Sequence, residues 1–128
     1  MRIHKNKGFT LLEVMISMII LAIGILGLAL LISVSIYGNS YSNESTRANA
    51  LAQQEVETLV NQASYGALPF VSITDSVSGK FKVYRAVSDK TSNPTIPTGI
   101  VKIDVVVSWT DQKALARTVN YSTLKPMI

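Results

Sequence analysis

A long, uninterrupted apolar run near the start of the chain constrains its fold more than any other feature. Residues 14–43 contain no charged side chain, and the densely apolar part, 14–36, exceeds the roughly 20 residues that a helix needs to cross about 30 Å of hydrocarbon. A single acid, Glu13, stands at the start of this run. An ionisable group in lipid is costly and usually has a partner and a function. The sequence therefore predicts a helix that enters a membrane.

Two ordinary explanations of such a run account for only part of it. A secretory signal peptide also has a basic start, but its apolar core is about 7–15 residues long and ends at a small-residue cleavage site. This run is longer, and no A-x-A-like site closes it. A plain single-pass anchor explains the length, but neither Glu13 nor the glycine that precedes Phe9.

The residues at the start of the run resemble the signature of the type IV pilin superfamily, which includes pilins, minor pilins and the pseudopilins of type II secretion. That signature is a short basic leader, a glycine, an aromatic residue usually followed by threonine, two apolar residues and a glutamate, and then a long apolar helix. Here it reads Gly8, Phe9, Thr10, Leu11, Leu12, Glu13. Residues 20–29 (ILAIGILGLA) look most like PilV-type minor pilins.

The resemblance implies how the N-terminus is processed and used. In the family, a membrane peptidase that is also an N-methyltransferase cuts after the glycine and methylates the new amine. This implies cleavage between Gly8 and Phe9 and methylation of Phe9. It also implies that Glu13, with Thr10, directs subunit assembly, Glu13 pairing with the amine of a neighbouring subunit. The implied partners are other pilin subunits in a mixed filament, the prepilin peptidase and the lipid of the inner membrane.

The distribution of charge predicts the orientation of the chain. The net charge is +4, but Arg2, Lys5 and Lys7 lie in the expected leader, so nine basic and eight acidic residues remain after it, a net of +1. Positive residues beside a membrane span stay in the cytoplasm. We expect a cytoplasmic leader, a single pass through the bacterial inner membrane and a periplasmic head, which later joins an extracellular pilus.

Helical periodicity continues beyond the lipid-facing run. Ala48, Ala52, Val56 and Leu59 recur every three or four residues, so one face of the helix can pack on a domain. We expect one helix from about residue 10 to residue 63. Its end is marked by Pro69 shortly beyond, as helix ends often are.

Two glycines, Gly24 and Gly27, lie inside the membrane part of this helix. In a bundle, small residues allow helices to approach closely. Ordinary glycines in a membrane helix and glycines that pack against another helix are both compatible with the sequence.

The second half of the chain changes to the two-residue period of strands. Residues 101–109 alternate apolar and mostly polar side chains, and segments 80–88 and 114–123 are rich in β-branched and aromatic residues. We expect three antiparallel strands on the amphipathic end of the helix, an α+β fold and also the fold that the resemblance implies. Trp109 is expected in the core of the head, together with Val56 and Leu59.

Four segments follow from these patterns: a leader (1–8), a transmembrane or filament-core helix (9–37), an amphipathic helix half (38–64) and a small globular β head (65–128). At 128 residues, the chain holds one small domain beside the helix.

Catalytic chemistry has almost no support in the sequence. Cysteine is absent, the single histidine, His4, lies in the expected leader, and the acids are scattered. We therefore expect no enzyme, no cofactor and no metal site.

Three classes of function remain: a minor pilin or pseudopilin that joins other pilins, a major filament subunit, and a binding module for DNA or surfaces. The second is disfavoured by the PilV-like helix and the small cysteine-free head. Lys80, Lys82 and Arg85 could contact phosphate, but a solvated strand face with Arg85 at an edge explains them more simply. We expect a minor pilin, with a type II secretion pseudopilin as the alternative.

Overall fold

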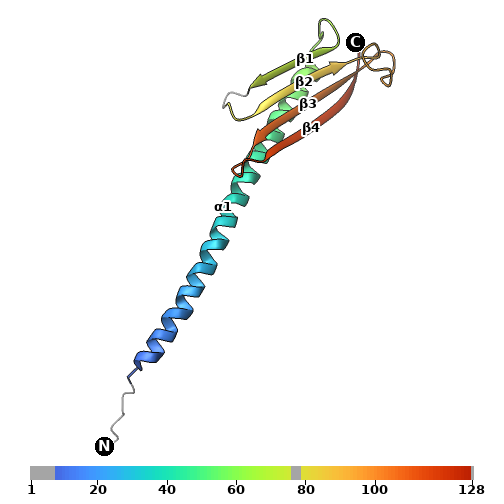
Figure 1. The fold of residues 1–128 in the computed structure, drawn as a ribbon. Helices are drawn as coiled ribbons and strands as arrows, with labels where there is room; N and C mark the ends of the chain where they lie inside the picture. The colour runs from blue at the N-terminus through green and yellow to red at the C-terminus, as the bar shows by residue number, and fades with distance from the viewer. Residues whose placement is uncertain (1–7, 76–78, 128) are drawn as a thin grey trace, which may run out of the picture. The chain divides into compact units, whose positions relative to one another are not determined.

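The fold is α+β, with one long helix followed by four strands (Figure 1). The computed structural model describes residues 8–75 and 79–127. The chain divides into two compact units, one ending at Gly38 and the other beginning at Asn39. The elements are helix α1 (Leu11–Asn61) and strands β1 (Phe70–Asp75), β2 (Lys82–Ser88), β3 (Ile100–Thr110) and β4 (Ala116–Pro126).

Helix α1 ends at Asn61, two residues earlier than its apolar stripe suggests. The last carbonyl groups of a helix need partners other than the helix itself. Here the Tyr65 hydroxyl donates to the Leu59 carbonyl at 2.6 Å, and the Lys125 ammonium donates to the Gln62 carbonyl at 2.9 Å. Because these side chains satisfy the end of the helix, the chain can turn there without a further helical turn.

The sheet has four strands, so the prediction of three was wrong. All neighbours are antiparallel, in the order β1-β2-β3-β4 (Figure 1). The missed strand, β1, is a short edge strand with an inverted pattern: Val71 and Ile73 are 55% and 70% exposed, whereas Phe70 and Ser72 are half-buried. Sequence patterns are usually interpreted by placing β-branched residues on the buried face. In β1 these residues face solvent, so the segment was not recognised as a strand.

The turn between β3 and β4 is one residue longer than expected and shifts the start of β4. The strand segments expected from the sequence, 101–109 and 114–123, leave a turn at residues 110–113, but the backbone of Asp111 donates to the Leu115 carbonyl at 2.9 Å. The Asp111 carboxylate also accepts hydrogen bonds from the backbone of Lys113 and Leu115, at 2.8 and 2.9 Å. Residues 111–115 therefore form the turn, in which Ala114 adopts a positive φ of 58°.

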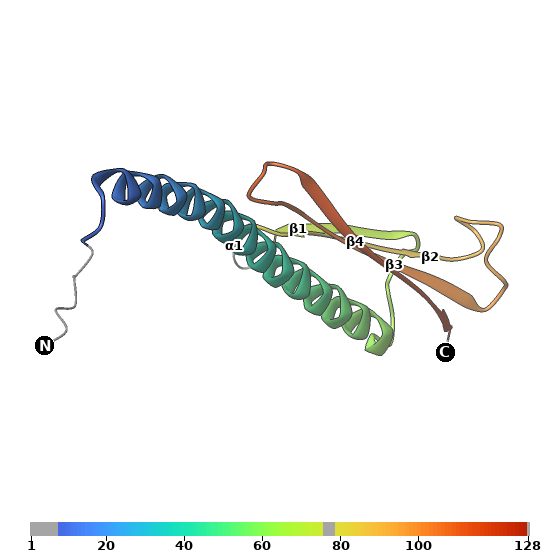
Figure 2. The same ribbon diagram turned by 90° about the horizontal axis from the view of Figure 1, so that it is seen from below.

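The core lies between the end of α1 and the inner face of the sheet. Figure 2 shows the green end of α1 on one side of the four strands. From the helix, Ala48, Ala52 and Leu59 are buried there. A larger set of buried apolar side chains comes from the strands β2 and β3 and from the residue just before β2: Phe81, Val83, Val87, Val101, Ile103, Val105, Val107 and Trp109.

Polar groups also join this part of the helix to the sheet. Glu44 is buried, and its carboxylate accepts hydrogen bonds from the Trp109 indole at 3.2 Å and from the Lys80 ammonium. The Arg85 guanidinium donates two hydrogen bonds of 2.7 Å to Glu55, which raise the pKa of Arg85. Arg85 therefore faces the helix, and its expected place at an edge of the sheet was wrong.

Trp109→Ala should lower the free energy of unfolding by about 3–5 kcal/mol, the range for truncating a large buried aromatic side chain. The side chain is 5% exposed, and its ring centroid lies 5.9 Å from that of Phe81. Denaturant unfolding of the full chain in detergent micelles measures the change. Trp109→Phe keeps most of the ring volume and loses the hydrogen bond to Glu44, so its cost should be smaller, about 1–3 kcal/mol. Equal costs for both variants would contradict this view of the core.

Glu44→Leu should destabilise the head by about 1–3 kcal/mol, since the Trp109 indole would be buried without an acceptor. Lys80 adds little to this cost because its side chain is 43% exposed and water can solvate the ammonium. The same unfolding measurement checks the prediction, and Glu57→Leu, at an exposed position of the same helix, is its control. A Glu44→Leu variant as stable as this control would show that the buried carboxylate does not hold the sheet to the helix.

Candidate assembly site at the start of the helix

The first turn of α1 contains the acid that the sequence singles out. The Thr10 hydroxyl accepts a hydrogen bond of 3.2 Å from the backbone of Glu13, and the Thr10 carbonyl accepts one of 3.2 Å from the backbone of Val14. Thr10 is therefore the N-cap residue, which satisfies a backbone donor that the helix leaves without a partner. A threonine followed three residues later by a glutamate is the sequence pattern of a capping box.

The Glu13 carboxylate is left without a partner inside the described part of the chain. No hydrogen-bond donor and no cation among residues 8–75 and 79–127 pairs with it. The nearby Ser17 hydroxyl is engaged elsewhere, since it donates to the Glu13 carbonyl at 2.8 Å. A negative charge in the first turn is favourable towards the helix dipole, by roughly 0.3–1 kcal/mol at an exposed site. The interaction with the helix dipole uses no hydrogen bond of the carboxylate, so Glu13 can still bind a cation.

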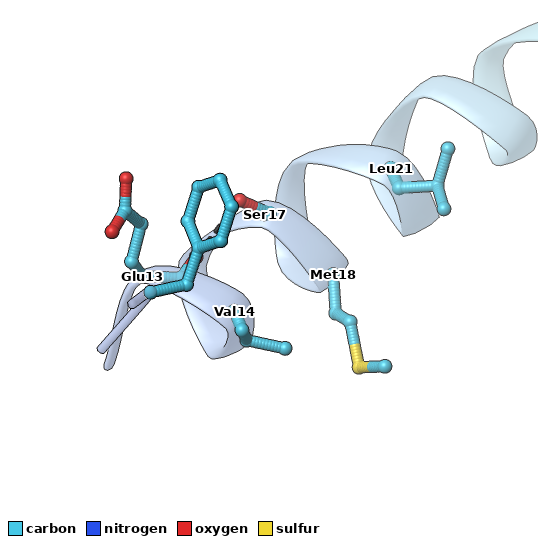
Figure 3. Close-up of a pocket in the computed structure, with 6 residues that line it drawn as sticks. Glu13, Val14, Ser17, Met18 and Leu21 are labelled. Atoms are coloured by element: carbon cyan, nitrogen blue, oxygen red, sulfur yellow. Dashed lines mark hydrogen bonds between the residues drawn. The ribbon is translucent and has the colours of Figure 1, made fainter. Parts of the chain in front are cut away.

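The surface around Glu13 is shallow and mostly apolar. A hollow of about 320 Å³ is lined by Phe9, Glu13, Val14, Ser17, Met18 and Leu21. In Figure 3 the carboxylate of Glu13 points away from the side chains of Met18 and Leu21. The acid thus lies at the rim of an apolar surface, and the rest of that surface is open to lipid or to another helix.

The apolar part of α1 is exposed along its whole length within this chain. The helix is long and apolar enough to cross a membrane. A β-carbon placed on Gly24 or Gly27 would meet no atom within 4 Å. Packing inside the chain therefore does not require these glycines, and their predicted role in contacts with other helices stays a prediction.

The expected head residues lie as follows. Leu59 and Trp109 are buried in the core, and Val56 is half-buried against it. The Trp109 indole was expected beside Val56 and Leu59, but its hydrogen bond is to Glu44, nearer the start of the helix. Sequence reasoning missed Glu44, although it precedes Ala48 by four residues and so belongs to the same stripe.

Neither a metal site nor a catalytic group stands out in the described ranges. No cluster of three or more histidine, cysteine, aspartate or glutamate residues suited to a metal ion occurs in residues 8–75 and 79–127. His4 and the basic leader residues lie outside those ranges. Four of the acids in the described ranges are engaged in ion pairs: Glu44 with Lys80, Glu55 with Arg85, Asp104 with Lys102, and Asp111 with Arg117.

Comparison with known proteins identifies the N-terminal segment. A model of the prokaryotic N-terminal methylation motif matches residues 3–29, which include Gly8, Thr10 and Glu13. No curated protein and no solved structure matches the chain. The prepilin-like leader of this motif and the long helix packed on an antiparallel sheet fit the type IV pilin superfamily. A motif of this type implies processing by a prepilin peptidase and assembly with other pilin subunits.

Gly8→Val should block maturation, because a peptidase can approach the backbone of glycine without hindrance from a side chain. The unchanged protein, extracted from membranes, should begin at methylated Phe9 in mass spectrometry. Gly38→Val, at a glycine far from the motif, is the control and should be processed normally. Finding Met1 as the N-terminus of protein in assembled filaments would rule out the predicted cleavage.

Proposed function

We propose that this chain is a structural subunit of a type IV pilus, a minor pilin that takes part in filament assembly and priming. The N-terminal methylation motif indicates a type IV pilin-like or pseudopilin protein, and proteins of this type are structural rather than catalytic. In this proposal residues 1–8 are the leader, 9–37 the membrane and filament-core helix, 38–64 the amphipathic half and 65–128 the head. The apolar helix and the motif are consistent with membrane anchoring.

The observation that carries the proposal is the Glu13 carboxylate at the mouth of an apolar helix, where no residue of the described ranges 8–75 and 79–127 pairs with it. Burying an isolated charge among apolar side chains is strongly unfavourable, so transfer into a filament core requires a cation. Cleavage after Gly8 would supply one on every subunit, as the amine of Phe9. Pairing of Glu13 with the amine of a neighbouring subunit offsets the cost and fixes the axial position of each new subunit.

A pseudopilin of a type II secretion system is the alternative, since the helix chemistry is common to both assemblies. A DNA-binding role is less well supported. Of the three cations that suggested it, Lys80 pairs with Glu44 and Arg85 pairs with Glu55. Lys82 lies opposite Asp75 across the strands. Lys80 and Arg85, already neutralised by carboxylates, would contribute little to phosphate binding. A role as a major subunit remains disfavoured for the reasons found in the sequence.

Glu13→Gln tests the proposal. The variant keeps the shape of the side chain and loses the charge, so it should insert and be cleaved but should not enter filaments efficiently. Ser17→Ala is the matched control, because it removes a polar group one turn further along and leaves the charge. The measurement is the amount of each variant that co-purifies with sheared filaments, relative to the amount in the membrane.

Recruitment of the Gln variant at the level of the unchanged protein would disprove charge pairing and reduce Glu13 to an interfacial residue. Identification of the co-purified partners by mass spectrometry separates the two assemblies. Pilus subunits support the minor pilin, and secretion-system pseudopilins support the alternative.

A further inference from the structure

The two margins of the sheet differ in how well they are protected against pairing with another strand. Edge strands leave a row of backbone groups without a partner, and proteins usually protect them with charged side chains or proline. Strand β4 has both, since Arg117 and Lys125 lie on its half-buried face and Pro126 ends it. Strand β1, the outermost strand at the other margin in Figure 1, contains neither a basic residue nor a proline. The margin formed by β1 is therefore open to a further strand.

Apolar side chains of β1 and β2 form a patch on the outer face of the sheet. Val71 and Ile73 of β1 are 55% and 70% exposed there. Across the ladder they lie opposite Ala86 and Tyr84 of β2, and Tyr84 is itself 37% exposed. These four side chains, the outer patch, extend to the free margin of the sheet. Contiguous exposed patches of apolar side chains are typical of interaction sites.

The inner side of β1 also has room for a partner. A hollow of about 330 Å³ lies between α1 and the strands β1 and β2, with Leu51, Thr74 and Val83 among its lining residues. Side chains of a strand point alternately to the two faces of a sheet. A strand added to β1 would therefore place every second side chain beside the outer patch and the others on the side of this hollow.

The chemistry of this margin selects an extended segment with a cation as the partner. In a strand, every second residue directs its N–H and C=O to the same side, so the six residues of β1 leave about three residues unpaired. Another extended backbone can pair with them while it covers the outer patch. Asp75, the last residue of β1, is exposed and forms no ion pair within residues 8–75 and 79–127. A cation of the partner beside Asp75 would complement this charge.

We propose that β1 receives an extended segment of a neighbouring subunit, which adds antiparallel to β1 as a fifth strand. Its apolar side chains lie beside Val71 and Ile73, and a lysine or arginine lies beside Asp75. This inference rests on the proposed function, in which subunits lie next to one another in a filament. A strand of six residues is smaller than the interface of a stable complex between free proteins, but the high effective concentration of adjacent subunits makes it sufficient.

The sequence of β2 supplies a probe whose register on β1 is known. Residues 82–88 (KVYRAVS) pair antiparallel with β1, with Lys82 opposite Asp75 and Ala86 opposite Val71. A synthetic peptide of this sequence therefore presents suitable apolar side chains and a cation to the free margin. Because the chain has no cysteine, one introduced cysteine gives a single cross-linking position.

Cross-linking of the full chain in detergent micelles to this peptide tests the added strand. The chain carries Val71→Cys, and the peptide carries a cysteine in place of either its alanine or its arginine. Disulfide formation in a glutathione redox buffer should be several-fold greater with the first peptide, because its cysteine lies on the same face as position 71. Leu124→Cys, exposed on the other edge strand, is the control and should give only background yields. Equal yields at positions 71 and 124, or with the two peptides, would overturn the added strand.

Asp75→Lys, combined with Val71→Cys, tests the chemistry of the partner. It should lower the yield with the lysine peptide and raise the yield with a peptide that has glutamate in place of the lysine. Each change should be up to about fivefold, the effect of one cross-strand pair of charges. Glu57→Lys makes the same change of charge at an exposed position of α1 and should alter neither yield. Yields that do not depend on the charge at position 75 would contradict the pairing of Asp75 with a cation of the partner.

Ile73→Lys tests the neighbouring subunit as the occupant. This variant and its matched control, Leu124→Lys, each place a lysine at an exposed position of an edge strand, outside the core. Ile73→Lys should be processed normally but should co-purify with sheared filaments in a smaller amount than Leu124→Lys. Equal amounts would show that no neighbouring subunit occupies β1. Absence of the unchanged protein from filaments would instead overturn the proposed function and, with it, this occupant, whereas the added strand is judged by the cross-linking.

Discussion

Close contact between α1 and the sheet is the constraint on which the rest of the head depends. It is made by two alanines one turn apart, Ala48 and Ala52, both with no exposed surface. Alanine loses no side-chain entropy on burial and occupies little space, so the backbone of the helix can lie near the inner face of β2 and β3. Only at such a short separation can the Glu44 carboxylate reach the Trp109 indole and Glu55 reach Arg85. A larger side chain at either alanine would push the helix outward and weaken the apolar contact and both polar contacts together.

The same helix is adapted to two surroundings, and its residues change accordingly near Gly38. Before that residue, large apolar side chains are exposed on every side of the helix, from 46% at Val14 to 79% at Leu11. Soluble monomers rarely expose an apolar surface of this extent. From Asn39 onward the helix is amphipathic, and its small residues face the sheet. The first unit therefore requires lipid or other helices, whereas the second supplies its own core.

The strongest patterns in the sequence were the easiest to interpret. Period and composition predict the apolar run and the alternation in β3, because both patterns extend over many residues. The burial of Trp109 follows from its place in that alternation. Contacts between individual side chains or strands were missed, because they depend on which helices and strands pack against one another. Glu44 lies in a polar segment, and only its spacing of four residues from Ala48 places it on the buried face. The β1 strand was missed because its β-branched residues face solvent, an arrangement that pairing with β2 imposes and that a local pattern does not reveal.

In the first turn of α1, Thr10 caps the helix, and the side chain of Glu13 is not used for capping. Thr10 caps the helix through the backbone N–H of Glu13, so the Glu13 side chain takes no part in this bond. An N-cap residue has non-helical backbone angles, and Phe9 therefore lies before the first regular turn. Under the proposed function, the Glu13 carboxylate can therefore pair with the amine of a second subunit while Thr10 keeps its bond to the start of the helix.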